Sequence, residues 1–235
     1  DQIDIVVADG GSTDGSLEID FLKSQDVRAL LTKKGKGKLS AQMRMAFAWA
    51  LSEGYEGVVV THGTDTLEET AYYLELTSNV NIPIVITGAM RSSNEIGADG
   101  LANLRSSLVV AVSDESSDKG VLVVMNDEAH TATYVTKTHT TNVATFQTPT
   151  FGPIGLVSKN EVIYFQKLLR EEHYEVNTVS KKVYLLKAYA GMGGELIDAI
   201  RKLGADGLVI EALGAGNLPP KTVPAIKQLL DDNIP

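Results

Sequence analysis

The chain has 235 residues, of which 43% are hydrophobic and 22% charged, with 21 glycines and 7 prolines. This composition excludes collagen-like, low-complexity and disordered classes, because it supplies enough apolar surface for a core. The formal net charge of -9 argues against nucleic-acid and anionic-membrane partners, which attract positively charged proteins. The absence of cysteine excludes a disulfide scaffold and a thiol nucleophile, and no apolar run approaches the roughly 20 residues of a membrane-spanning helix.

Short, largely β-branched apolar runs alternate along the chain with helical patterns. The runs expected to be strands are residues 3–7, 58–61, 82–87, 120–125, 182–186 and 207–211. The patterns expected to be helices are residues 40–53, 66–79, 99–114 and 194–203. Several runs are apolar at every position, as expected of strands that are buried on both faces of a parallel sheet. The alternation predicts an α/β fold in which helices flank a parallel sheet built from right-handed βαβ units.

Residues 166–180 form a polar, charged stretch with Arg170-Glu171-Glu172-His173 at its centre. A new strand–helix–strand pattern follows this stretch. We therefore expect a linker at 166–180, after which residues 181–235 form a second, smaller α/β lobe.

The residues directly after each strand are the candidates for function, because parallel sheets bind ligands at the carboxyl ends of their strands. The first candidate, Asp9-Gly10-Gly11-Ser12-Thr13-Asp14-Gly15-Ser16, follows the strand expected at 3–7. Its glycines permit close approach of a ligand to backbone N–H groups, and its aspartates can accept hydrogen bonds from a ribose or a base. The same residues also suit a polar turn between a strand and a helix, and they match no Walker or dinucleotide fingerprint.

The second candidate, Thr61-His62-Gly63-Thr64-Asp65-Thr66, lies after the second expected strand and before a helix. This arrangement would place Thr64 and Asp65 beside the N–H groups of a helix N-terminus, which favour an anionic ligand. Thr64 could act as a nucleophile or position a water, and Asp65 could accept hydrogen bonds from an ammonium group. Thr66 with Glu69 three residues later is the pattern of a capping box, so a helix cap without chemistry is the alternative.

The third candidate is Thr136-Lys137-Thr138, in a polar stretch. A lysine beside a hydroxyl can act as a general base only where its surroundings lower its pKa from about 10.4, and a lysine in a polar loop is otherwise solvated. The residues alone leave both interpretations open. The four histidines, His62, His130, His139 and His173, lack the spacing of a metal site, so no metal is expected.

From about residue 55 to its end the chain resembles the L-asparaginase family of amidohydrolases, through motifs that follow the family's order. They are Thr61-His62-Gly63-Thr64-Asp65-Thr66 with Leu67-Glu68-Glu69-Thr70, Gly88-Ala89-Met90-Arg91, Ala98-Asp99-Gly100, Val123-Val124-Met125-Asn126-Asp127, Val135-Thr136-Lys137-Thr138-His139-Thr140-Thr141, Tyr189-Ala190-Gly191-Met192 and Gly214-Ala215-Gly216-Asn217-Leu218-Pro219. The resemblance implies hydrolysis of the side-chain amide of asparagine, a small amino-acid substrate, to aspartate and ammonia without a metal or organic cofactor. The last two motifs are closer to the family's cytoplasmic type I branch, so we expect a cytoplasmic protein. Family members assemble from several copies, which makes a homo-oligomer a candidate state.

By motif, Thr64, Asp65 and Lys137 look like the family's Thr–Asp–Lys group. The resemblance implies that Thr64 lies at the reacting amide, through its hydroxyl or a positioned water, and that Lys137 accepts a proton. It also implies that Asp65 holds the α-amino group of the substrate. Gly63 is then part of the same binding loop, and Ala89 offers a backbone contact nearby. A hydroxyl, an amine and helix-terminal N–H groups together suit an acyl-transfer site.

The chain departs from the family in its N-terminal part. The family's first strand ends in Thr-Gly-Gly-Thr-Ile, whose second threonine is the acyl nucleophile, and this motif is not recognisable here. Ala8-Asp9-Gly10-Gly11-Ser12 runs parallel to it and would put Ser12 at the position of the nucleophile. The family's tyrosine loop, its carboxylate-binding serine and its late glutamate are not recognisable either. We therefore expect a truncated second lobe and weak or absent activity.

Residues 3–59 instead resemble the GT-A (family 2) glycosyltransferases. The matching pieces are residues 6–16, residues 34–40 leading into 43–48, and residues 54–59. This resemblance implies that residues 9–16 bind the nucleotide part of a sugar donor, although the Asp-x-Asp-like metal site of that family is missing.

Together the two resemblances predict a chimeric chain. Its expected parts are a glycosyltransferase-like segment at 1–57, an asparaginase-like N-terminal core at 58–165, the linker at 166–180 and the truncated C-terminal lobe at 181–235. The alternatives to an asparaginase-like hydrolase are a nucleotide-sugar binding fragment and an inactive chimeric scaffold.

Overall fold

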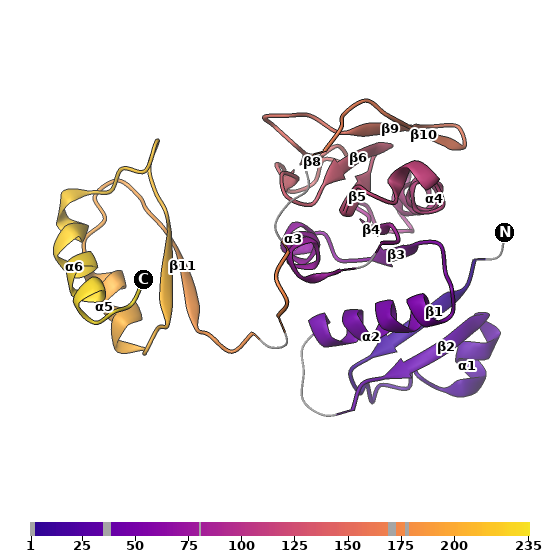
Figure 1. Ribbon diagram of the computed structural model, residues 1–235, viewed down its shortest axis with the longest axis horizontal. Coiled ribbons are helices and arrows are strands. Elements are labelled where there is room, and N and C mark those ends of the chain that lie inside the picture. The colour runs from indigo at the N-terminus through magenta and orange to yellow at the C-terminus, as the bar shows by residue number, and fades with distance from the viewer. Residues whose placement is uncertain (1–2, 35–38, 80, 169–172, 177–178) are drawn as a thin grey trace. The chain divides into compact units, whose positions relative to one another are not determined.

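The computed structural model describes residues 3–34, 39–79, 81–168, 173–176 and 179–235. The chain divides into two compact units, Asp1–Glu175 and Val176–Pro235, whose elements are drawn in Figure 1. Each unit has its own hydrophobic core.

A six-stranded sheet organises the first unit, with strand order β10-β9-β6-β5-β4-β3. Its strands are β3 (Val58–Thr61), β4 (Ile84–Thr87), β5 (Val121–Met125), β6 (Glu128–Thr131), β9 (Gly155–Ser158) and β10 (Glu161–Tyr164). Strands β3, β4 and β5 are parallel, whereas β6, β9 and β10 continue the sheet with antiparallel pairings. The sheet is therefore mixed.

Helices α3 (Leu67–Thr77) and α4 (Gly100–Ala111) lie on opposite sides of β4 and β5 (Figure 1). Along β4, Ile84 and Ile86 pack in one core cluster with residues of α3, while Val85 packs in the other with Val110 of α4. Side chains of a strand alternate between its two faces, so a strand that is covered on both sides buries every residue. This explains why β5 is apolar throughout and why β4 is apolar up to its last residue, Thr87.

The α/β class predicted from the sequence is confirmed, and the strands predicted at 58–61 and 207–211 have the predicted bounds. The antiparallel half of the sheet was not predicted. Asn126 and Asp127, at φ 52° and 60°, form a two-residue turn between β5 and β6, and two positive φ values are typical of the type I′ hairpin turn. The strand that follows, Glu128–Thr131, is too polar to be recognised by its composition.

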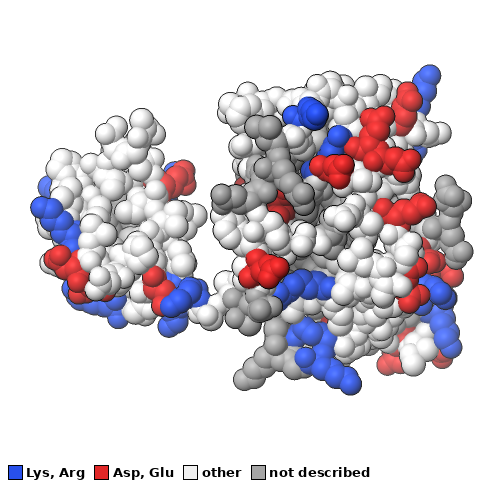
Figure 2. All heavy atoms as spheres, viewed as in Figure 1, with Lys and Arg blue, Asp and Glu red and all other residues white. Residues whose placement is uncertain are grey.

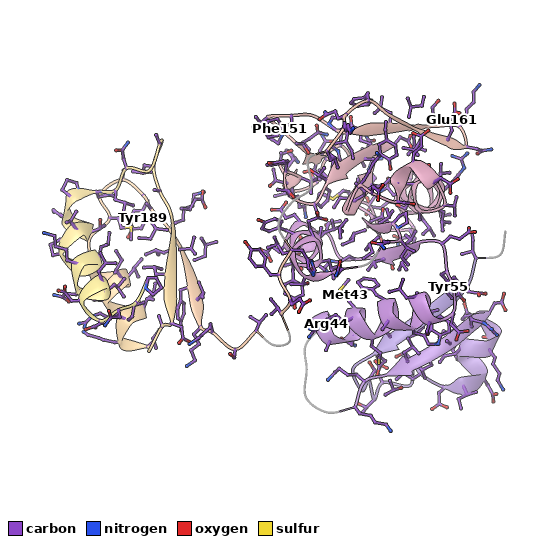
Figure 3. The ribbon with its side chains drawn as sticks, in the orientation of Figure 1. Met43, Arg44, Tyr55, Phe151, Glu161 and Tyr189 are labelled. Atoms are coloured by element: carbon purple, nitrogen blue, oxygen red, sulfur yellow. The ribbon has the colours of Figure 1, made fainter. Side chains whose placement is uncertain are left out.

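The N-terminal part of the first unit contributes a parallel pair of strands, β1 (Ile5–Asp9) and β2 (Val27–Thr32), with α1 (Ile19–Ser24) and α2 (Leu39–Ser52). Met43 and Phe47 of α2 are buried in the same core cluster as Leu67 of α3. Figure 3 shows Met43 on the side of α2 toward α3. This helix therefore packs with the main sheet of the unit. Helix α1 and strand β2 were not predicted.

A short ribbon completes the first unit, in which β7 (Thr136–Lys137) pairs with β8 (Phe146–Gln147) in antiparallel register. A 3-10 turn, η1 (Asp114–Ser116), follows α4.

The second unit is a parallel pair of strands, β11 (Val183–Lys187) and β12 (Gly207–Glu211), with helices α5 (Glu195–Lys202) and α6 (Val223–Asp231) and the 3-10 turn η2 (Pro220–Thr222). Its buried core consists of Ala188, Met192, Ile197, Ala225 and Leu229. No helix within the described ranges is both long and apolar enough to cross a membrane. Most of the surface drawn in Figure 2 is neither acidic nor basic, and acidic side chains gather mainly at the upper right of the view.

Candidate active site

The loops after β3 and β4 are joined at the carboxyl ends of these strands. The His62 N–H donates a hydrogen bond to the Thr87 carbonyl at 2.8 Å, which continues the parallel pairing of β3 and β4 by one residue. The His62 ring is held between the Gly63 carbonyl, 2.7 Å from Nδ1, and Thr70 Oγ1, 3.1 Å from Nε2. The start of the loop that carries Gly63, Thr64 and Asp65 is therefore anchored through His62, whose backbone binds β4 and whose ring binds α3.

The structure brings Lys137 to Thr64 and Asp65. Lys137 Nζ donates hydrogen bonds to Thr64 Oγ1 at 3.0 Å and to Asp65 Oδ1 at 2.9 Å. The Lys137 side chain is 17% exposed and that of Asp65 is 96% exposed. The hydrogen bond from Lys137, together with its positive charge, lowers the pKa of Asp65. Asp65 is therefore a charged carboxylate that faces solvent, beside an amine that is largely covered.

Glu68 is a contact of this group that the sequence patterns did not reveal. Thr66 is the N-cap of α3 but makes no side-chain cap hydrogen bond, so the capping box predicted for Thr66 and Glu69 does not form. Glu68 instead accepts a hydrogen bond from Thr136 Oγ1 at 3.2 Å and one from the backbone N–H of Lys137. The sequence could have indicated Glu68 only by its position, because it lies in the first turn of the helix that follows Asp65. Side chains of that turn can reach a segment that packs against the loop.

The loop after β4, which contains Ala89, is held by Asp99. The Asp99 carboxylate accepts hydrogen bonds from the backbone N–H groups of Met90, at 3.0 and 3.1 Å, and of Arg91, at 2.9 Å. Partial burial acts to raise the pKa of Asp99, but the hydrogen bonds from Met90, Arg91 and Asn103 prevail and lower it. The Asn103 side chain also donates to the Gly88 carbonyl at 3.0 Å. Ala89 thus lies between two backbone segments with fixed positions.

Ser12 lies in the loop after β1, where Asp9 binds it. Ser12 Oγ donates to Asp9 Oδ1 at 2.6 Å, and the Ser12 N–H donates to Asp9 Oδ2 at 3.0 Å. The hydroxyl of Ser12 and the N–H of Gly11 lower the pKa of Asp9, so its carboxylate is a weak proton acceptor. Among the described residues, no hydrogen bond connects Ser12 with Thr64, Asp65 or Lys137.

Metal ligands are not gathered at this site. In the described part of the chain, no three His, Cys, Asp or Glu side chains lie close enough together to hold a metal ion. The chemistry of the site is that of a hydroxyl, an amine and carboxylates.

Comparison with known families assigns the chain. The sequence model described as "Asparaginase, N-terminal" matches residues 17–170, and that described as "Glutaminase/Asparaginase C-terminal domain" matches residues 182–235. The chain belongs to the asparaginase family. The N-terminal match includes residues 17–59, and so most of the range 3–59 for which the sequence predicted a relation to glycosyltransferases.

Individual relatives agree with this assignment. An L-asparaginase of Bacillus licheniformis is 37% identical over 77% of this chain and 56% of its own length. A probable periplasmic L-asparaginase of Haemophilus influenzae is 36% identical over 87% of this chain and 61% of its own length. The chain therefore spans little more than half the length of these relatives.

A solved structure shows the same fold. The crystal structure of a probable cytoplasmic L-asparaginase from Campylobacter jejuni superimposes with a TM-score of 0.81, at 31% identity. The match covers 98% of this chain and 80% of the other, so the fold of the relative extends over both units.

Proposed function

We propose that this chain hydrolyses the side-chain amide of L-asparagine, with Thr64, Asp65 and Lys137 as its reacting group. The observation that carries the proposal is the position of Lys137 Nζ, 3.0 Å from Thr64 Oγ1 and 2.9 Å from Asp65 Oδ1. A hydroxyl and a carboxylate that follow a parallel strand and both contact an amine from the β7–β8 ribbon are groups that can carry out acyl transfer. The similarity to proteins described as L-asparaginases supports asparagine as the substrate.

In the proposed reaction the C–N bond of the amide breaks and a C–O bond forms, so that asparagine and water give aspartate and ammonium. The hydroxyl that attacks belongs to Thr64 or to a water held by Thr64, and it gives its proton to Lys137 Nζ. The lysine must be neutral when it accepts this proton, which then passes to the leaving nitrogen. If Thr64 itself attacks, water then cleaves the resulting Thr64 ester, which releases aspartate and restores the Thr64 hydroxyl. Both transfers need heavy atoms within hydrogen-bond reach, about 2.6–3.2 Å, and the separation of Thr64 and Lys137 meets this requirement.

Substrate binding is proposed for Asp65 and for the backbone at Gly63 and Ala89. The Asp65 carboxylate is charged and exposed, which suits it to accept hydrogen bonds from the α-ammonium group of an amino acid. Asp99 fixes Met90 and Arg91, so the backbone at Ala89 is held ready for a ligand. Preorganised backbone groups of this kind stabilise charge at no cost of reorganisation.

Ammonia release from L-asparagine by the purified chain tests the proposal. Lys137→Met and Thr64→Val should each lower kcat by about 10²–10⁴-fold, because each removes one partner of the proton transfer. The matched control is Lys181→Met, which removes a lysine that pairs with Asp206 at 3.2 Å in the second unit. This control should keep kcat within about twofold of the wild type. A Lys137→Met variant with an unchanged rate would show that the proposal is wrong. The expectation of weak or absent activity also remains a prediction, and a wild-type chain without ammonia release would bear it out and contradict the proposed hydrolysis.

Ser12 as the acyl nucleophile remains a separate part of the proposal. Its support is the match of Gly10-Gly11-Ser12 to the family's Gly-Gly-Thr after a comparable strand. Asp9 holds the hydroxyl but is a weak base, so activation would have to come from another group. Ser12→Ala lowers kcat strongly if this residue is the nucleophile, and leaves it nearly unchanged if the attack comes from Thr64 or a water.

The chimeric origin of residues 3–59, the four-part division of the chain, assembly into a homo-oligomer and a cytoplasmic location also remain predictions. The solved relative is described as cytoplasmic, which supports the last of these, although the Haemophilus influenzae relative is described as periplasmic. Nucleotide-sugar binding at residues 9–16 is disfavoured, because the Asp9 carboxylate already accepts hydrogen bonds from its own loop.

A further inference from the structure

The carboxylate of Glu68 joins the two segments that make up the proposed site. Glu68 lies in the first turn of α3, three residues after Asp65. Through its two oxygens it accepts a hydrogen bond from Thr136 Oγ1, at 3.2 Å, and one from the backbone N–H of Lys137. One carboxylate on α3 therefore binds both residues of β7.

Strand β7 belongs to a short ribbon outside the six-stranded sheet. It is two residues long and pairs with β8, Thr136 opposite Gln147 and Lys137 opposite Phe146. The N–H and the hydroxyl of Thr138 extend this pairing by donating to the Thr145 carbonyl, both at 2.8 Å. A two-stranded ribbon is marginally stable by itself, and burial of Val135 and Phe146 in the main core holds it against the rest of the unit. Glu68 adds polar contacts from α3 to both residues of β7.

The same short segment, residues 64–68, thus binds Lys137 at both ends. Thr64 and Asp65 bind its amine, and Glu68 binds its backbone N–H. Lysine has a long, flexible side chain, so its amine stays at one place only if the main chain is also fixed. A carboxylate is favourable at this location because the N-terminus of a helix carries partial positive charge.

We propose that Glu68 is a positioning residue, whose carboxylate fixes the main chain of Lys137 against α3 so that the amine lies between Thr64 and Asp65. The inference rests on the proposed function of these three residues. Glu68 acts through Lys137 and does not itself touch the reacting atoms.

Glu68→Met tests this role with little change of side-chain length. Glutamine would not serve, because the Thr136 hydroxyl can accept from its NH₂ while its oxygen accepts from the Lys137 N–H. The methionine replaces neither hydrogen bond, so the clamp is broken. We expect kcat to fall about tenfold or more and KM to change by less than about threefold, since misplacing a catalytic group by about 1 Å can cost 10²-fold in rate. The matched control is Glu69→Met, which changes the neighbouring, exposed glutamate of the same turn and should leave kcat unaltered.

A double-mutant cycle separates positioning from a merely structural role. If Glu68 acts through Lys137, then Glu68→Met added to Lys137→Met should change the remaining rate by less than about twofold. An equal loss of rate with and without Lys137 would overturn the inference, because Glu68 would then act independently of the lysine.

A second readout does not depend on activity. Acetic anhydride modifies accessible lysine amines, and mass spectrometry reports the rate at Lys137. Loss of the clamp should raise this rate severalfold in Glu68→Met and not in Glu69→Met, and an unchanged rate would overturn the inference. If the wild type releases no ammonia, this labelling still decides the role of Glu68, so failure of the inference can be told apart from failure of the proposed function. If Glu68→Met fails to fold, Thr136→Val, which removes one of the two donors, should raise labelling in the same direction, and no rise would overturn the inference.

Discussion

A buried histidine in the first unit has a hydrogen-bond partner for only one of its two ring nitrogens among the described residues. His130 of β6 is fully buried, with Nδ1 3.0 Å from Thr148 Oγ1 and Nε2 3.4 Å from Glu128 Oε2. The contact with Glu128 lacks hydrogen-bond geometry, so Nε2 has no hydrogen-bond partner among the described residues. Burial lowers the pKa of His130, while the charge of Glu128 acts in the opposite direction. The folded chain therefore favours the neutral imidazole.

We predict that His130 makes the folded state sensitive to acid. The pKa of His130 in the folded state lies below the unfolded value of about 6.5. Its contribution to the free energy of unfolding is therefore fully present above about pH 6.5. As the pH falls from there toward the folded-state pKa, the unfolded chain binds a proton that the folded chain does not, and stability is lost. Urea unfolding at about pH 7.5 and about pH 5.5 should show a smaller loss for His130→Asn than for the wild type.

The control for this prediction is His139→Asn, which removes a solvent-exposed imidazole and should leave the loss of stability in place. An equal loss of stability in His130→Asn and in the wild type would mean that other groups cause the acid sensitivity.

The elements that carry the site are joined at their ends by close backbone packing. The carboxyl ends of β3 and β4 are linked through His62 and Thr87, and Thr87 Oγ1 donates to the Val124 carbonyl of β5 at 2.7 Å. Directly after β4, a Cβ at Gly88 would lie 2.5 Å from the His62 carbonyl oxygen and 3.2 Å from Thr64 Cγ2. The loop that carries Thr64 can therefore approach β4 only because residue 88 has no side chain.

Gly88→Ala is predicted to displace the Thr64 loop. The neighbour at the shortest distance is backbone, which cannot rotate away, so we expect a loss of about 1–3 kcal/mol in the free energy of unfolding, the usual cost of overpacking. The kcat for ammonia release should fall as well, because Thr64 moves relative to Lys137. Urea denaturation measures the first effect and the ammonia assay the second.

Gly63→Ala is the control for stability alone, since a Cβ there would have no heavy atom within 4 Å. Its cost should be much smaller than that of Gly88→Ala. Equal costs would show that the close approach at Gly88 does not limit the packing of the loop.

At the scale of the whole molecule, the chain consists of two units with separate cores, and the family matches follow the same division. The N-terminal match ends at residue 170 and the C-terminal match begins at residue 182. The core of the second unit is small, and domains of this size bury a smaller fraction of their surface than larger ones. We therefore expect the second unit to be the less stable of the two.

Limited proteolysis tests the predicted linker at 166–180. Trypsin cleaves after lysine and arginine, and Lys167 and Arg170 lie in this polar stretch. We therefore expect the first cleavage after one of these two residues. Cleavage after Lys181 should be slower, since Lys181 and the N–H of Lys182 both bind Asp206. Mass spectrometry of the first fragments identifies the site, and early cleavage within residues 58–165 would contradict the predicted division.

The sequence by itself determined the α/β class, several strands and the candidates Thr64, Asp65 and Lys137. It could do so because burial on both faces of a sheet requires continuous apolar runs, and because the polar residues Thr64 and Asp65 stand out after such a run. Lys137 lies in a polar stretch, and its role was implied only by the resemblance to the asparaginase family. The antiparallel strand Glu128–Thr131 escaped this reasoning, since its pairing depends on the turn at Asn126 and Asp127.

Only the tertiary structure decided which of these residues meet. Lys137 lies 73 residues from Thr64 in the chain, yet packing of the β7–β8 ribbon against α3 places their side chains 3.0 Å apart. The same packing decides that Glu68, and not Glu69, binds β7. The orientation of α3 directs the Glu68 carboxylate to β7 and leaves Glu69 exposed. Local sequence specifies which residues are polar, but contacts between distant segments depend on how their apolar faces are buried together.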